Sequence, residues 1–243
     1  MTVKAFQTIE RAPAYMKVYR AIEEKISDGT LKDGAHLPTE AELCAQFGVT
    51  RSTVREGLRL LEQTGLIVRG SAKKFFIKRP AASDIAAAAS RSFALGGVTF
   101  SEVFDALATM YPEAARLAAR RLSKANIAEL KKVGEAMKSA RDGDHEATVA
   151  GAVEFFQLIA RGLDNRVMLA MLQSLNLMIG ESLRQVIARA PKAKDRILNA
   201  QKKLVGAFEA RDADLAADWM AKHIADLKRG YDVAKVDMDA AIL

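Results

Sequence analysis

Three arginines alternate with small hydroxyl residues in one short segment: Thr50, Arg51, Ser52, Thr53, Arg55 and Arg59. The arginines are four residues apart, so on a helix they share one face. Free backbone N–H groups and hydroxyls at a helix N-terminus favour a phosphate, and an arginine fork matches a phosphate or the edge of a guanine. This segment predicts contact with nucleic acid; a solvated cationic face is the alternative.

The excess of positive charge is concentrated in the first third of the chain. The 243 residues include 37 Lys and Arg against 30 Asp and Glu, a net charge of +7. Residues 1–80 hold 14 basic and 9 acidic residues, so they account for +5 and the remainder for +2. A basic excess in a small unit favours a polyanionic partner, and nucleic acid first.

A second set of polar residues interrupts apolar helical stripes. Gln157, Gln201 and His223 each lie on the apolar side of a different predicted helix. A buried polar group that lacks a hydrogen-bond partner costs about 1–3 kcal/mol. Two interpretations are open: the three side chains satisfy one another or trapped water, or they line a pocket for a polar ligand.

The first 80 residues contain the elements that would position the arginines. Helical spacing of apolar residues predicts helices over residues 13–28, 39–46 and 51–63, with Thr39 and Glu42 as a capping box. Two apolar runs, residues 66–68 and 75–77, predict short strands joined by a basic turn that includes Gly70 and Lys73. Two helices joined at Gly48 and followed by a β-wing are typical of a winged helix-turn-helix.

The rest of the chain shows helical periodicity and no strand pattern. Helices are predicted over residues 101–122, 124–141, 144–163, 166–188, 192–210 and 213–229, which indicates an all-α bundle of six or seven helices. The fold class is therefore mainly α. We expect a winged helix in residues 1–79, a linker and short helix in residues 80–98, and the bundle in residues 99–243.

Cysteine content and hydropathy indicate a cytoplasmic protein. Cys44 is the single cysteine, so no intramolecular disulfide forms. The N-terminus lacks a continuous apolar leader, and the most apolar stretch, residues 167–180, is too short to span a bilayer. We expect no membrane partner.

The N-terminal motifs resemble the winged helix of the GntR superfamily of bacterial transcription regulators. The resemblance rests on GAHLPTEAEL at residues 34–43, FGVTRSTVREGL at residues 47–58 and GLI at residues 65–67. It implies that Thr50, Arg51, Ser52, Thr53 and Arg55 contact double-stranded DNA, with Gly70 at the wing. The charge pattern adds Arg59 and Lys73. Many relatives carry an arginine where this chain has Ala41.

The C-terminal part resembles the FCD ligand-binding domain of the FadR subfamily. The matching segments are residues 104–119, 155–165 and 207–223. Many members bind a divalent metal through one aspartate and three histidines, and the corresponding positions here are Val153, Gln157, Gln201 and His223. Valine offers no donor and amides are poor ligands for a transition metal, so we expect no metal cofactor.

The resemblance also implies a small-molecule effector inside the bundle. Leu107 replaces a family arginine that often faces the pocket, and Met171, Leu175 and Met178 add adaptable apolar surface. The expected lining residues are Leu107, Val153, Gln157, Met171, Leu175, Met178, Gln201 and His223. Leu107 and Val153 stand where the family has charged residues. Their apolar side chains favour an effector that is bulkier or less acidic than a small carboxylate, such as an acyl-thioester or an aromatic acid.

These patterns predict a homodimeric transcription regulator, a repressor, that binds a short palindromic operator and responds to its effector. The first alternative is a regulator whose bundle only dimerises and binds no effector. The second is an enzyme that uses His223, but no carboxylate or thiol lies at a sequence spacing from His223 that would indicate a catalytic partner. We therefore expect no enzymatic activity.

Overall fold

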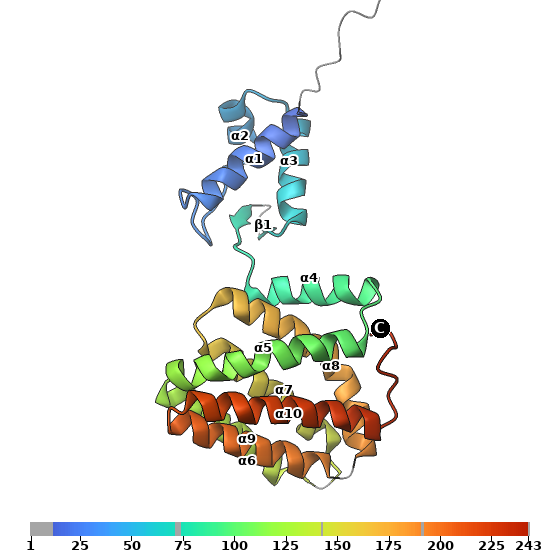
Figure 1. Cartoon of the computed structure of the whole chain (residues 1–243). Coiled ribbons are helices and arrows are strands. Elements are labelled where there is room, and N and C mark those ends of the chain that lie inside the picture. Colours follow the sequence, from blue (N-terminus) through green and yellow to red (C-terminus); the bar gives the residue numbers. More distant parts are fainter. Residues whose placement is uncertain (1–11, 71–73, 142, 191, 243) are drawn as a thin grey trace, which may run out of the picture. The chain divides into compact units, whose positions relative to one another are not determined.

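The computed structural model describes residues 12–70, 74–141, 143–190 and 192–242 (Figure 1). Its contacts divide the chain into two compact units, Met1–Ala81 and Ala82–Leu243. The architecture is mainly α, with a small two-stranded sheet in the first unit and a helical bundle in the second, and this confirms the predicted fold class.

The first unit has the elements of a winged helix. Helices α1 (Ala14–Ser27), α2 (Glu40–Phe47) and α3 (Arg51–Gln63) precede the antiparallel strands β1 (Ile67–Arg69) and β2 (Phe75–Ile77). The strands pair with Ile67 opposite Ile77. Apolar residues from all five elements form one core: Val18, Ile22, Leu43, Val54, Leu58, Leu61, Ile67 and Phe75.

Local chemistry fixes where α2 and α3 begin. The Thr39 hydroxyl accepts from the Glu42 backbone N–H, and the Glu42 carboxylate accepts from the Thr39 N–H at 2.7 Å, which completes the predicted capping box. Gly48 ends α2 with φ of 64°, a left-handed conformation that glycine adopts without strain. Thr50 then caps α3, so the turn between the two helices is encoded residue by residue.

The second unit is a bundle of seven helices among the described residues. They are α4 (Ala82–Leu95), α5 (Phe100–Arg121), α6 (Lys124–Ser139), α7 (His145–Gly162), α8 (Arg166–Arg189), α9 (Ala193–Glu209) and α10 (Ala213–Val233). α10 packs along α5 and α9, α7 packs along α6 and α8, and α4 packs on α8. The short helix expected within residues 80–98 is therefore α4, and it is a component of the bundle.

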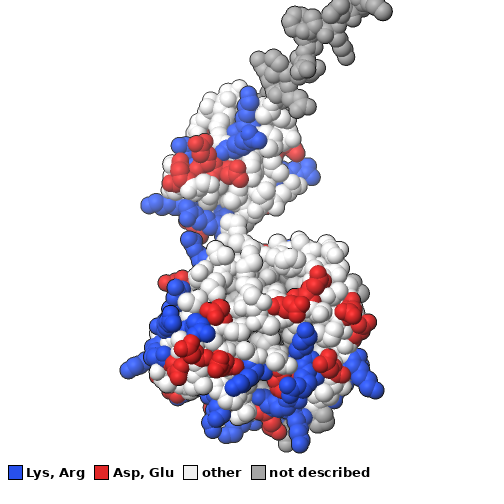
Figure 2. Space-filling view, in the orientation of Figure 1, with Lys and Arg blue, Asp and Glu red and all other residues white. Residues whose placement is uncertain are grey.

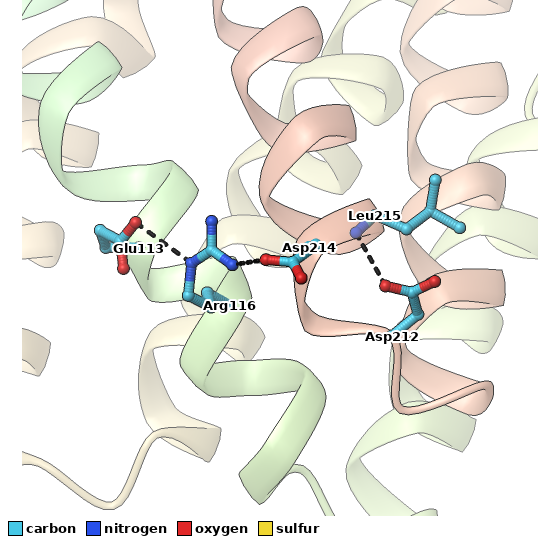
Figure 3. Close-up of polar contacts among 5 residues, drawn as sticks. All are labelled: Glu113, Arg116, Asp212, Asp214 and Leu215. Carbon is cyan, nitrogen blue, oxygen red and sulfur yellow. Dashed lines mark hydrogen bonds and ion pairs between the residues drawn. The ribbon is translucent and has the colours of Figure 1, made fainter.

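Two attachments hold α10 against the rest of the bundle. Asp212 caps α10 by accepting from the Leu215 N–H at 2.9 Å, and Arg116 of α5 bridges Asp214 in the first turn of α10 and Glu113 (Figure 3). At the other end the chain after α10 returns to the start of α5, where the Ile242 N–H donates to the Val98 carbonyl at 2.9 Å.

Among the described residues, no helix combines the length and the apolar character needed to cross a membrane.

Candidate functional site

The N-terminus of α3 presents a cluster of hydroxyls at the surface of the first unit. The Thr50 Oγ1 atom lies 2.9 Å from both the Ser52 and the Thr53 hydroxyl oxygens, and it accepts from the Thr53 N–H. Thr50 and Ser52 are exposed, and Thr53 is half-buried. The structure thus brings the three predicted hydroxyls together at a helix end whose dipole favours an anion.

The three arginines of α3 are all exposed, while the opposite face of the helix is buried in the core. Arg51, Arg55 and Arg59 project from the side that does not carry Val54 and Leu58. This placement leaves the guanidinium groups accessible to a groove or a phosphate backbone. An exposed cationic helix face is what nucleic-acid contact requires.

Arg55 has a partner that the sequence pattern does not reveal. Its Nε donates to Oε2 of Glu40, at the start of α2, over 2.8 Å. The two residues are fifteen positions apart on different helices, so helical periodicity within one element cannot find the pair. The contact orients the Arg55 guanidinium while leaving its two terminal nitrogens free of that carboxylate.

Gly70, which follows strand β1, packs closely against the Phe76 ring of strand β2. A Cβ atom at Gly70 would lie 2.1 Å from the Phe76 ring, and the Gly70 N–H donates to the Lys74 carbonyl at 2.8 Å. The Arg69 guanidinium lies over the Phe75 ring, 5.1 Å from its centroid. Lys73, the predicted basic residue at the tip, lies outside the described residues.

The interior of the bundle contains two polar side chains from adjacent helices that lack hydrogen-bond partners. Gln201 of α9 and His223 of α10 are each 2% exposed. Both amide atoms of Gln201 and the Nε2 atom of His223 are buried without a partner. Burial lowers the pKa of His223 to about 4, although nearby Asp226 opposes the shift, so the imidazole is neutral at pH 7.

A row of aromatic rings connects His223 to a second polar position. The His223 ring stacks on Phe156 of α7 with centroids 5.4 Å apart, and Phe156 meets the edge of Tyr111 of α5 at 4.7 Å. The Tyr111 hydroxyl donates to Oδ1 of Asn176 on α8 over 2.6 Å, while Nδ2 of Asn176 has no partner. Tyr111 and Asn176 are 65 residues apart, which explains why the sequence pattern did not pair them.

The other predicted lining residues differ in burial. Leu107, Leu175 and Met178 are buried in the core, whereas Val153 and Gln157 are half-buried. Met171 is 44% exposed, so its side chain does not line the buried interior. Of the polar residues predicted to point inward, Gln201 and His223 are fully buried and Gln157 is not.

An open cavity adjoins His223 between α9 and α10. Its volume is about 330 Å³, and His223, Ala200, Trp219, Lys222, Asp226 and Arg229 are among the residues that line it. Two lysine ammonium groups lie over the Trp219 ring, Lys222 at 5.0 Å and Lys203 at 5.6 Å from its centroid. The cavity therefore has a neutral imidazole in its wall and a rim of mixed charge, in which Asp226 is paired with Arg196 and Arg229.

The donor set inside the bundle does not fit a transition metal. At the four positions implied by resemblance, Val153 has no donor atom, Gln157 and Gln201 offer amides, and only His223 is an imidazole. Among the described residues, no group of three or more His, Cys, Asp or Glu side chains is placed to hold a metal ion. The chemistry of this interior is that of neutral hydrogen bonding.

Two family models match the chain, one for each unit. The model described as bacterial regulatory proteins, gntR family, matches residues 14–77, and that of the FCD domain matches residues 102–226. The first match covers α1 to β2, and the second covers the helices that contain Tyr111, Phe156, Gln201 and His223.

Several curated proteins are similar to this chain. The Glc operon transcriptional activator of Escherichia coli (strain K12) is 27% identical over 227 residues, covering 90% of this chain and 89% of that protein. The HTH-type transcriptional repressor NanR of Salmonella schwarzengrund (strain CVM19633) is 28% identical over 221 residues, covering 85% and 80%. The histidine utilization repressor of Klebsiella aerogenes is 45% identical over 69 residues, 28% of this chain and 29% of that protein.

One solved structure shares the fold. Streptococcus agalactiae GntR superposes with a TM-score of 0.70 at 23% sequence identity, covering 88% of this chain and 99% of that one.

Proposed function

This chain belongs to the gntR family of bacterial regulatory proteins, with an FCD domain, and is a DNA-binding transcription regulator; we propose that it represses its target genes until a small molecule binds inside the bundle. The observation that carries the effector proposal is the pair Gln201 and His223, both buried and both left with unpartnered polar atoms. A packed core does not leave such groups unpaired at no cost, whereas a binding site does so because the ligand supplies the bonds.

In this proposal α3 enters the major groove of the operator. Arg51, Arg55 and Arg59 contact base edges or phosphates, and the hydroxyls of Thr50, Ser52 and Thr53 bind the phosphate backbone at the helix N-terminus. Gly70 and Lys73 approach DNA at the wing. The exposed arginine face and the hydroxyl cluster support this orientation.

We propose that the regulator acts as a homodimer on a short palindromic operator, because two-fold symmetry places two recognition helices on two half-sites. Large apolar side chains that α4 leaves exposed support a contact between copies there: Ile85, Phe93 and Leu95. Figure 2 shows a largely uncharged surface over this helix on the face that it draws. Leu95 is 90% exposed, so a partner copy would bury substantial apolar area.

For the effector we propose an acyl-thioester or an aromatic acid, bound without a metal. The cavity is lined by three cations and one carboxylate, Arg196, Lys222, Arg229 and Asp226, and this excess of positive charge suits the charged end of either molecule. Binding releases the operator only if the ligand has different affinities for the DNA-competent and DNA-incompetent arrangements. We propose no catalytic activity, and we place the protein in the cytoplasm.

The test is a titration of candidate effectors against the complex of the full-length protein with its operator. The operator is first selected from a random duplex library, and binding is followed by fluorescence anisotropy at a fixed salt concentration. We expect acyl-thioesters or aromatic acids to weaken operator binding at least tenfold, a coupling free energy of about 1.4 kcal/mol. If no ligand changes the affinity while the protein remains dimeric, the bundle serves dimerisation alone.

A further inference from the structure

Three of the five buried polar side-chain atoms that lack a hydrogen-bond partner among the described residues belong to Gln201 and His223. Gln201 has both its donor, Nε2, and its acceptor, Oε1, buried without partners, and Nε2 of His223 adds a third free position. Most buried amides in proteins are bonded at both ends. A ligand that satisfies Gln201 must therefore offer an acceptor and a donor side by side.

Charge is missing from the same interior. The buried polar side chains of the described residues are Thr148, Ser174, Asn176, Ser182, Gln201 and His223, and none of them is an arginine, a lysine or a carboxylate. An anion moved to this depth would lose its hydration and gain no opposite charge. Four charged residues line the cavity, Arg196, Lys222, Asp226 and Arg229, and none of them is fully buried. Asp226 forms ion pairs with Arg196 and Arg229, which leaves Lys222 as the cation without a carboxylate partner among these four residues.

Among common ligand groups, few meet both conditions. A carboxylate offers only acceptors, so it would leave Oε1 of Gln201 facing another oxygen. A primary amide, a lactam or an imide carries a donor next to an acceptor on one planar edge and has no charge, so it can form two antiparallel hydrogen bonds with the Gln201 amide.

We propose that the effector inserts an uncharged, amide-like group between α9 and α10, where it bonds directly to Gln201 and His223 without a metal ion. The proposal rests on the proposed effector function but changes the expected ligand chemistry, because a simple aromatic acid carries no amide-like group. The cavity between these helices reaches His223 of α10 and Ala200 of α9. Gln201 does not line it, so the ligand must displace side chains of the bundle to reach the Gln201 amide. A charged part of the same molecule then lies at the rim beside Lys222 and Arg229.

The experiment compares amides with carboxylates of the same shape. Benzamide and benzoate, nicotinamide and nicotinate, and salicylamide and salicylate are each titrated into the full-length protein without DNA. Saturation-transfer NMR detects binding, and the fluorescence of Trp219, the only tryptophan of the chain, follows the titration. We expect at least one amide to bind about tenfold more tightly than its acid, and EDTA to leave this binding unchanged.

Two matched variants test whether the preference for an amide over its acid depends on the buried Gln201 side chain. Gln201→Met removes both amide atoms from the interior and should abolish the preference for the amide. Gln185→Met makes the same change at an exposed position of α8 and should leave the preference intact. Because the control carries the identical substitution, a general effect of methionine is separated from the loss of the buried amide.

Three results would overturn the proposal: acids that bind as tightly as their amides, a panel in which no amide binds, or amide binding that EDTA abolishes. The proposed function fails in a different way. If amides bind with the expected preference but leave operator affinity unchanged, the ligand assignment holds and the effector function does not. If an acid releases the operator while no amide binds, the effector function holds and the ligand assignment does not.

Discussion

The two units of this protein place their polar residues in opposite ways. In the winged helix the candidate binding residues are exposed on α3, and the core beneath them is apolar. In the bundle, Gln201 and His223 are buried, and both amide atoms of Gln201 and Nε2 of His223 are unpaired. An exposed site costs the fold little and suits a large, charged partner, whereas a buried site reduces stability until its ligand arrives.

The comparison predicts that between pH 4 and 6.5 the bundle makes stability depend on pH through His223. Burial holds the pKa of His223 at about 4, below its ordinary value of 6.5. The unfolded chain therefore binds more protons between these values, so stability is complete above pH 6.5 and falls as the pH decreases toward 4, by about 3 kcal/mol in all.

Urea unfolding followed by Trp219 fluorescence between pH 4.5 and 7.5 measures this dependence. His223→Leu should flatten the profile, and His145→Leu, at an exposed position, should retain it. A wild-type profile that His223→Leu does not change would show that the imidazole is not buried in its neutral form.

The exposed site predicts the opposite behaviour, a loss of binding without a loss of stability. Arg51→Ala should weaken operator binding by about 2 kcal/mol, roughly thirtyfold, if the guanidinium reads a base edge. The thermal midpoint should remain near that of the wild type, because Arg51 is exposed and has no core contact. Fluorescence anisotropy with the selected operator measures the effect.

Arg20→Ala is the matched control, since Arg20 is also an exposed arginine of the first unit but lies on α1. Equal weakening by both substitutions would indicate a general electrostatic contribution, and an unchanged affinity in Arg51→Ala would remove Arg51 from the interface.

Substitution of one glycine in each unit allows the helix packing of the two units to be compared. A Cβ at Gly57 would lie 2.9 Å from Cγ1 of Val18 and 3.1 Å from the Tyr15 carbonyl, so α1 and α3 approach closely at this point. Gly57→Ala should destabilise the winged helix by about 1.5 kcal/mol, because the two helices must separate. Calorimetry of the full chain measures the change.

Gly134→Ala provides the control in the bundle. No atom lies within 4 Å of a Cβ at Gly134, and the residue is inside α6, so alanine should stabilise the helix by about 0.5–1 kcal/mol. If Gly134→Ala destabilised the protein as much as Gly57→Ala, the conclusion that Gly57 lies at a close helix contact and Gly134 does not would be wrong.

A comparably small effect is expected from removal of the buried amide itself. Gln201→Met replaces two unpartnered polar atoms with an apolar side chain of similar size, so the ligand-free protein should become more stable, by about 1 kcal/mol. Urea unfolding measures the change, with Gln185→Met as the exposed counterpart. A loss of stability in Gln201→Met would mean that the amide has a partner in the folded protein.

Sequence patterns predicted the local parts of this structure well, for physical reasons. The helix at Arg51–Gln63 and the capping box of Thr39 and Glu42 depend on residues within one turn of each other, and both are confirmed. The burial of Gln201 and His223 followed from their places on apolar stripes. These features require no knowledge of how distant elements meet.

Patterns within one segment cannot predict contacts between residues that are far apart in the sequence. Glu40 and Arg55, and likewise Tyr111 and Asn176, meet only because separate helices pack together. Helical periodicity places Met171 on the same apolar stripe as Leu175, yet Met171 is 44% exposed and Leu175 is buried. The packing of other helices on α8 decides this difference, and the pattern within one helix does not contain it.

Native mass spectrometry of the full-length protein, as purified from bacterial cells, tests the central claim that the buried polar interior is a metal-free site for a small molecule. We predict a dimer that carries a small organic molecule and no metal, and we predict that Gln201→Met purified in parallel has lost that molecule. A dimer with one divalent metal per chain, or an organic molecule that Gln201→Met retains in full, would contradict the account.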